Sequence, residues 1–223
     1  MKIKFAAVSI LVALFIGCED DKVVAITDKP VYAELTARYT KATNSTVGTS
    51  QFWDGSKGGR KLIFHPSAKL LFNDVTMDYN NVDYLYSKSL EGFHSPSNFK
   101  ITDVNDKTFD NSITITSAEL PTTSLLDTIN SSVPLIITWV GSAVQDDETI
   151  TLRIAGVGAK QNVKGSTSVT FSLSDFASLT SSKNSAVELS IERTKSVGLT
   201  VDLGGSGNIK AEYIGLPKTV FLK

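Results

Sequence analysis

Apolar and polar side chains alternate along this chain with a period of two residues, and the alternation limits the folds open to it. In Val31–Thr40 every second residue is apolar, while Glu34, Thr36 and Arg38 fall in the other phase. Successive side chains of a β-strand point to opposite faces of a sheet, so this segment is predicted to be a strand buried on one side. The apolar set that would face the core is Val31, Ala33, Leu35, Ala37 and Tyr39.

The same alternation predicts further strands and leaves little room for helices. Residues 186–193 place Val187, Leu189 and Ile191 on one face. Shorter predicted strands are residues 113–116, 149–154, 168–173 and 219–222. No segment after the first eighteen residues shows a helical period over three turns, and a single turn is predicted near Ser174 as its N-cap. The predicted fold class is therefore all-β.

Turn residues divide the predicted strands into two groups. Short strands with a turn every 8–15 residues favour antiparallel β-sandwiches. Residues 120–132 are rich in turn formers and lack alternation, so they are predicted to be a linker. The prediction is an N-terminal sandwich in residues 25–119 and a C-terminal one in 133–223, with one large β-sandwich as the alternative. Residues 134–154 resemble adjacent strands of an immunoglobulin-like domain with Trp139 in its core, which implies an architecture and no activity.

A glycine-rich segment is predicted to close a hairpin near the end of the chain. Residues 204–207 read Gly-Gly-Ser-Gly between two apolar segments, 199–203 and 208–214. Glycine takes positive φ without strain, so the four residues are predicted to be the loop of a β-hairpin.

The first eighteen residues have the pattern of an export signal. Lys2 and Lys4 form a basic head, and the 13 residues that follow to Gly17 are uncharged, too few to span a bilayer comfortably. Residues 14–18, Leu-Phe-Ile-Gly-Cys, resemble the lipobox of bacterial lipoproteins. That resemblance implies that residues 1–17 are a signal peptide and that Cys18 carries the lipid. Residues 18–24, with three acidic side chains after Cys18, are predicted to be an acidic tether.

Composition excludes several classes of function. The chain carries 22 basic and 23 acidic side chains, so nothing in its net charge of −1 points to a nucleic-acid partner. One Cys and two His cannot form a closed Cys/His zinc site, and a single Cys cannot form an internal disulfide framework. No nucleophile elbow, phosphate-binding loop, zinc-protease motif or dinucleotide fingerprint is present. We therefore predict no catalytic residue, metal site or cofactor.

Aromatic side chains among turn residues are the best candidates for ligand contact. Trp53, Tyr84 and Tyr86 lie amid Gly, Asn, Asp and Ser, where flat rings could stack on a sugar or contact a protein. Trp53 is predicted to be the most exposed, and Tyr84 and Tyr86, two residues apart, to share a sheet face. A position in the sandwich core is the alternative for all three.

These observations lead to one leading function and two alternatives. The leading prediction is a non-enzymatic lipoprotein of the bacterial cell envelope, at the outer membrane or cell surface, whose β-sandwich body presents a binding or structural surface. The sequence does not name its ligand, and a glycan and an envelope protein are the candidate partners. The alternatives are a carbohydrate-binding module that uses the exposed aromatics and a glycan-processing hydrolase with unmarked carboxylates. Asp127, Thr128 and Ile129 also resemble a short bacterial O-glycosylation signal in the predicted linker.

Overall fold

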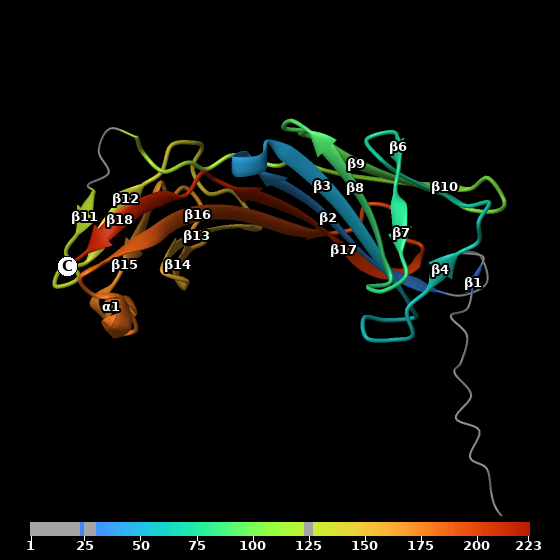
Figure 1. Cartoon of the computed structure of the whole chain (residues 1–223). Coiled ribbons are helices and arrows are strands. Elements are labelled where there is room, and N and C mark those ends of the chain that lie inside the picture. The colour runs from blue at the N-terminus through green and yellow to red at the C-terminus, as the bar shows by residue number, and fades with distance from the viewer. Residues whose placement is uncertain (1–22, 25–29, 123–126) are drawn as a thin grey trace, which may run out of the picture.

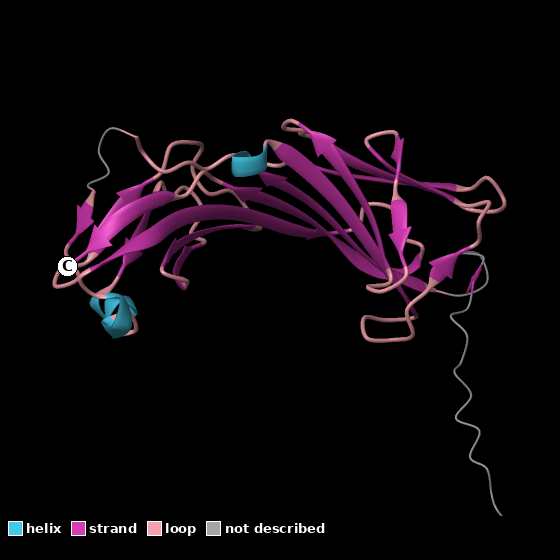
Figure 2. Ribbon diagram, viewed as in Figure 1, coloured by secondary structure: helices cyan, strands magenta, loops and turns pink. Residues whose placement is uncertain are grey.

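The structure, a computed structural model, describes residues 23–24, 30–122 and 127–223 and confirms the all-β fold class (Figures 1 and 2). These residues form strands β1 to β18, one α-helix of five residues and two short 3-10 helices. The sheets stack around hydrophobic cores as in a β-sandwich. None of the helices in these ranges has the length and apolar character needed to cross a membrane.

A ten-stranded sheet arches along the whole molecule (Figure 1). β2 coincides with the predicted strand at Val31–Thr40, and its buried residues are the predicted apolar set. The main path through this long sheet runs β11 (Thr128–Ile129), β18 (Lys218–Leu222), β16 (Ser185–Gly198), β17 (Gly204–Ile214), β2, β3 (Ser45–Asp54), β8 (Leu85–Glu91) and β7 (Asp78–Asn80). The two remaining strands are β13 (Glu148–Ile154), which pairs with β16, and β14 (Val157–Gln161), which pairs with β13.

Three smaller sheets complete the architecture. One has the order β10 (Thr108–Ile113), β9 (Ser97–Thr102), β5 (Lys69–Phe72) and β6 (Val75–Thr76). The second joins β12 (Leu135–Thr138) to β15 (Ser168–Phe171), and the third joins β1 (Val23–Val24) to β4 (Ile63–Phe64). The last two residues of the predicted tether therefore pair with another strand, while residues 1–22, including Cys18, lie outside the described ranges.

Buried apolar side chains form two clusters that lie along the long sheet. The first draws on β2, β3, β5, β9, β10 and β17, with Phe52 and Phe99 among its members. The second draws on β12, β13, β15, β16 and β18, with Trp139 and Phe171 among its members. Trp139 is thus a core residue, as the sequence predicts.

Two long strands connect the two clusters. Val187, Leu189 and Ile191 of β16 belong to the second cluster, whereas Val197 at the other end of β16 packs against the first. β17, which follows β16 in the chain, supplies Ile209 to the first cluster. The first cluster is therefore completed by residues from the end of the chain. The division into domains at residues 120–132 stays a prediction.

The glycine-rich segment near the end of the chain is a strand and not a loop, which corrects the predicted hairpin. Residues 204–207 begin β17, and the turn lies at residues 199–203. A Cβ at Gly205 would lie 2.6 Å from the carbonyl oxygen of Val31, and one at Gly207 would collide with the carbonyl oxygen of Ala33. Glycine is needed here because β17 and β2 approach closely around a bulge in their parallel pairing.

A glycine in β3 makes room for an aromatic ring of the facing sheet. The ring of Phe72, in β5, is completely buried and lies on the backbone of Gly48, where a Cβ would come within 2.7 Å of ring atom Cδ1. Phe72 also packs on Phe99, with 4.9 Å between the ring centroids. This contact fixes the distance between the two sheets of the first cluster.

Two smaller predictions also need correction. The predicted helical turn is α1 (Leu173–Ala177), and its N-cap is Ser172, not Ser174, because Ser172 forms a capping box with Asp175. The predicted strand at residues 113–116 ends at Ile113, the last residue of β10. Burial still alternates there, since Ile113 and Ile115 both lie in the first cluster.

Candidate functional site

The outer face of the long sheet, opposite the hydrophobic clusters, contains a hollow of about 730 Å³. Its walls come from β2, β3, β16 and β17, together with residues just outside these strands. Most of the lining residues belong to the polar phase of the alternation. The same pattern that places apolar side chains in the core therefore places these polar side chains on the outer face. The lining residues are Glu34, Leu35, Thr36, Arg38, Thr40, Thr43, Ser45, Val47, Thr49, Lys57, Ser196, Asn208, Lys210 and Glu212.

Strand register places these side chains in rows across the hollow. One row contains Ser196, Lys210, Thr36 and Thr49, which are successive cross-strand partners. Residues directly opposite each other in neighbouring strands lie about 4.5–5.5 Å apart, so their side chains are neighbours on the sheet surface. The row offers one ammonium group and three hydroxyl groups on a single surface.

A buried carboxylate organises the charges of the hollow. Glu212 is 3% exposed, and its two oxygens pair separately with Arg38 Nε and Lys210 Nζ. Burial alone raises the pKa of Glu212, but the hydrogen bonds from Arg38 and Lys210 outweigh it and hold the pKa below the ordinary 4.5. The hydrogen bond to Glu212 also raises the pKa of Arg38. Glu212 is therefore ionised in the folded protein and fixes two cations in position.

The lowered pKa of Glu212 predicts a loss of stability in acid. A pKa that is lower in the folded than in the unfolded chain stabilises the fold above the ordinary value, and this contribution disappears as the pH falls through the folded pKa. Glu212→Gln should therefore lose less stability than the wild type when the pH falls below about 4.5. Urea unfolding at a series of pH values measures the difference, and parallel losses in both proteins would contradict this assignment.

Two further contacts border the hollow. Lys57 Nζ lies 2.5 Å from Glu34 Oε1, and Asn208 Nδ2 donates to the hydroxyl oxygen of Tyr32 at 3.1 Å. Tyr32 is on the outer face of β2, edge-on to Trp53 with 5.8 Å between ring centroids. An aromatic pair thus lies on the same face as the hollow, although neither ring lines it.

The predicted ligand aromatics are not brought together on one surface. Trp53 is only 7% exposed, so the expectation that it is the most exposed of them is wrong; it is the cross-strand partner of Tyr32 and forms a bridge with Lys61. Tyr86 is 8% exposed on the core side, where its hydroxyl accepts from the Phe64 amide at 2.9 Å.

Tyr84 is half-buried and does not share a strand face with Tyr86. It precedes β8 and has a φ of 53°, in the left-handed region, which breaks the alternation that the spacing of two predicts. Lys61 Nζ lies 5.3 Å from the centroid of the Tyr84 ring. The described residues contain no cluster of three or more His, Cys, Asp or Glu side chains suited to a metal ion.

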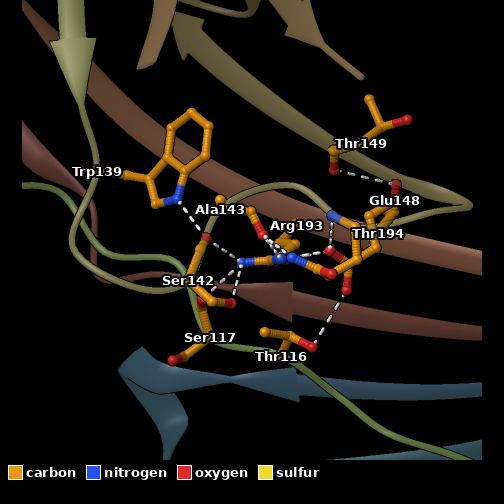
Figure 3. Close-up of polar contacts among 10 residues, drawn as sticks. Thr116, Ser117, Trp139, Ser142, Ala143, Glu148, Thr149, Arg193 and Thr194 are labelled. Carbon is orange, nitrogen blue, oxygen red and sulfur yellow. Dashed lines mark hydrogen bonds and ion pairs between the residues drawn. The ribbon is translucent and has the colours of Figure 1, made fainter. Parts of the chain in front are cut away.

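A second polar cluster, around Arg193 and Glu148, is closed to solvent. Arg193 and Glu148 are 2% and 4% exposed and form an ion pair beside the second hydrophobic cluster (Figure 3). Arg193 also donates to the carbonyl oxygens of Ser142 at 2.8 Å and Ala143 at 2.9 Å. The same Ser142 oxygen accepts from Trp139 Nε1 at 3.0 Å.

The carboxylate of this cluster is equally well satisfied. Glu148 accepts from the Gln145 amide at 2.8 Å and from the Thr116 hydroxyl at 3.2 Å. The pair thereby ties β13 and β16 to the loop before β13 and to the chain segment after β10. Sequence reasoning missed Arg193, although it falls in the inward phase of Val187, Leu189 and Ile191. A charged residue in an inward phase is the signal that could have identified it.

The predicted glycosylation triplet occupies a sheet edge. Thr128 and Ile129 form β11, which pairs in parallel with β18. Asp127 is exposed and lies 3.0 Å from Lys218 Nζ. The structure does not test modification of Thr128, and this stays a prediction.

Comparisons with known proteins give only distant likenesses. No family model matches the chain, and no curated protein matches it. Among solved structures it is similar to a Ca²⁺-stabilised ice-binding adhesin of an Antarctic bacterium, with 15% identity over 86% of this chain and 49% of that one, and a TM-score of 0.27. It is also similar to fibronectin(III)-like modules of CbhA from Clostridium thermocellum, with 9% identity over 87% of this chain and 93% of that one, and a TM-score of 0.25.

A third similar structure is SGBP-B of the mixed-linkage glucan utilization locus of Bacteroides ovatus, in complex with a heptasaccharide. The identity is 12% over 81% of this chain and 54% of that one, with a TM-score of 0.23. The chain spans about half the length of the adhesin and of SGBP-B. Likenesses this weak carry no argument about function, so the function has to be argued from the residues of this chain.

Proposed function

We propose that this protein is a non-enzymatic lipoprotein of the bacterial cell envelope, held by Cys18, whose β-sandwich body binds a ligand in the hollow of the long sheet. The observation that carries the binding role is the hollow itself: a recess of about 730 Å³, lined by charged and hydroxyl side chains, on the sheet face away from both cores. The lipobox-like sequence at residues 14–18 supports the anchor and a place at the outer membrane or cell surface.

The carboxylates of the hollow favour binding over hydrolysis. A glycosidase needs one protonated and one ionised carboxyl group about 5–9.5 Å apart. Glu34 and Glu212 both line the hollow, but Glu34 is the cross-strand partner of Asn208, four residues before Glu212 on β17. That spacing separates them by roughly 13 Å along the strands. The lowered pKa of Glu212 also opposes a general acid, which requires a raised pKa.

Glycan binding is the more specific form of this proposal, and the hollow supports it better than the aromatic platform does. Trp53 and Tyr86 are buried, and only Tyr84 among the three predicted contacts is half-buried. If Trp53 contacts a ligand, Trp53→Ala should abolish glycan-dependent changes in tryptophan fluorescence. A glycan that binds without such a change would assign binding to the hollow instead.

The anchor is tested by Cys18→Ala. Each buried CH₂ contributes about 0.8 kcal/mol to membrane binding and two acyl chains hold stably, so nearly all of the protein should move from the membrane fraction to the soluble fraction. Fractionation, together with the mass of the N-terminal peptide, measures this. Ser9→Ala, in the same segment, is the matched control and should stay in the membrane fraction. A membrane-bound Cys18→Ala protein and a wild-type peptide without lipid mass would contradict the proposal.

A further inference from the structure

The hollow has an excess of positive charge that its own carboxylates do not neutralise. Its lining contains Arg38, Lys57 and Lys210 against Glu34 and Glu212, three cations against two anions. Lys57 is paired with Glu34, and Glu192, whose charge also acts on Arg38, is paired with Arg153. The excess therefore lies where Arg38 and Lys210 share the carboxylate of Glu212. A ligand that brings one negative charge to that position would complete the ion pairing.

Arg38 is held so that the two terminal amino groups of its guanidinium, here called its fork, remain available to bind a ligand. Glu212 accepts from Nε, and the two terminal amino groups of the guanidinium have no partner among the described residues. The side chain of Arg38 is 53% exposed, whereas that of Glu212 is 4% exposed. A guanidinium fixed on one side can donate two parallel hydrogen bonds to a carboxylate from the other.

The rest of the lining is suited to a sugar. Six hydroxyl side chains line the hollow: Thr36, Thr40, Thr43, Ser45, Thr49 and Ser196. Each hydroxyl can both donate and accept, which matches the hydroxyl groups of a saccharide. No aromatic ring is among the lining residues, so stacking does not supply the affinity in the hollow, and charge has to.

We propose that the hollow binds an acidic polysaccharide, with a sugar carboxylate received by Arg38 and Lys210 and the sugar hydroxyl groups bonded by the threonine and serine side chains. This inference rests on the proposed function, since it names the ligand class of the same surface. Arg38 and Lys210 contact the ligand, and Glu212 is a positioning residue that aims both cations.

The test is binding of polygalacturonate to the full chain carrying Cys18→Ala, measured by calorimetry at low salt. Arg38→Gln should weaken binding by about 10- to 100-fold, the effect of losing hydrogen bonds to a charged group. Arg38→Lys keeps the positive charge but loses the two terminal amino groups of the guanidinium, so its affinity should lie between those of the wild type and Arg38→Gln. Glu212→Gln should weaken binding because it releases both cations from their positions, although the lost negative charge by itself would strengthen it. Glu212→Asp, which restores the carboxylate on a side chain one CH₂ shorter, should recover part of the loss. Raising the salt towards 1 M, where the Debye length is about 3 Å, should also weaken it.

Lys164→Gln is the matched control for the loss of one surface cation. Lys164 is 64% exposed and is paired with Asp146 at 2.6 Å, but does not line the hollow. This variant should bind polygalacturonate as the wild type does. An equal loss in Lys164→Gln and Arg38→Gln would mean attraction by surface charge in general and would overturn the site.

Three comparison ligands separate this inference from the proposed function. Polyglutamate carries carboxylates without sugar hydroxyl groups. If it binds as strongly as polygalacturonate, the ligand is an acidic protein and the inference of a glycan ligand is overturned. Neutral dextran that binds equally well, unaffected by Arg38→Gln, would overturn the acidic ligand yet keep the binding surface. If dextran sulfate binds more tightly than polygalacturonate, the anionic group that the hollow recognises is a sulfate and not a carboxylate. Absence of polygalacturonate binding overturns this inference and leaves the Cys18 anchor to its own test.

Discussion

Replacing Glu148 by alanine is expected to lower the free energy of unfolding by about 3–5 kcal/mol, because it leaves the guanidinium of Arg193 buried without its counter-ion. Arg193 donates to the backbone carbonyl oxygens of Ser142 and Ala143 from inside the protein, and these oxygens also accept from Trp139 Nε1 and Gln145 Nε2. Arg193 therefore cannot leave the interior without breaking its own hydrogen bonds to them. Urea denaturation of Glu148→Ala and the wild type at pH 7 measures the effect.

A second ion pair on the same strands provides the control for Glu148. Arg153 and Glu192 also join β13 to β16, at 3.6 Å, but their side chains are 46% and 24% exposed. Glu192→Ala should cost no more than about 1 kcal/mol, the range of surface pairs. The double variant Glu148→Leu with Arg193→Met removes both charges and should be clearly more stable than Glu148→Ala. Equal costs for Glu148→Ala and Glu192→Ala would contradict the argument from burial.

Phe72→Ala is expected to destabilise the first cluster by about 3–5 kcal/mol, the range for removing a buried phenylalanine. Its ring fills the space between Phe99 and the backbone of Gly48, so alanine leaves a cavity between two sheets. Gly48→Ala alone should cost about 1–3 kcal/mol, because its Cβ would meet the ring of Phe72.

The two substitutions at this contact should not be additive. Once Phe72 is alanine, the added methyl group of Gly48→Ala meets a cavity, so it should cost nothing or restore part of the lost stability. A double-mutant cycle by urea denaturation measures the coupling, expected at about 1–3 kcal/mol. Additive losses would show that Gly48 is required for a reason other than the Phe72 ring.

Several elements could be predicted because a local pattern controls them. β2 begins and ends at the predicted residues, since a one-residue shift would turn all its apolar side chains into solvent. The inward positions Val187, Leu189 and Ile191 of β16 are confirmed for the same reason. The polar phase of β2 supplied Glu34, Thr36 and Arg38 to the hollow, although the sequence did not mark them as a site.

Other features depended on what lies opposite a residue in space. A glycine-rich segment is a strand because β2 passes too close for a Cβ, and no local signal distinguishes this from a turn. Trp53 lies in a segment rich in turn residues, yet its place beside Tyr32 and Lys61 buries it. Tyr84 and Tyr86 have strand spacing, but the positive φ of Tyr84 breaks the alternation.

The sequence by itself determined the all-β class, the strand faces and the chemical character of each face, because a period of two assigns every side chain to one side of a sheet. It also contains the lipobox-like pattern on which the proposed anchor rests. Only the tertiary structure decided which strands are neighbours. Register across β16, β17, β2 and β3 brings Ser196, Lys210, Thr36 and Thr49 into one row and places Glu212 beside Arg38. A strand's own residues do not specify its partner, since pairing is settled by contacts between segments as much as 176 positions apart.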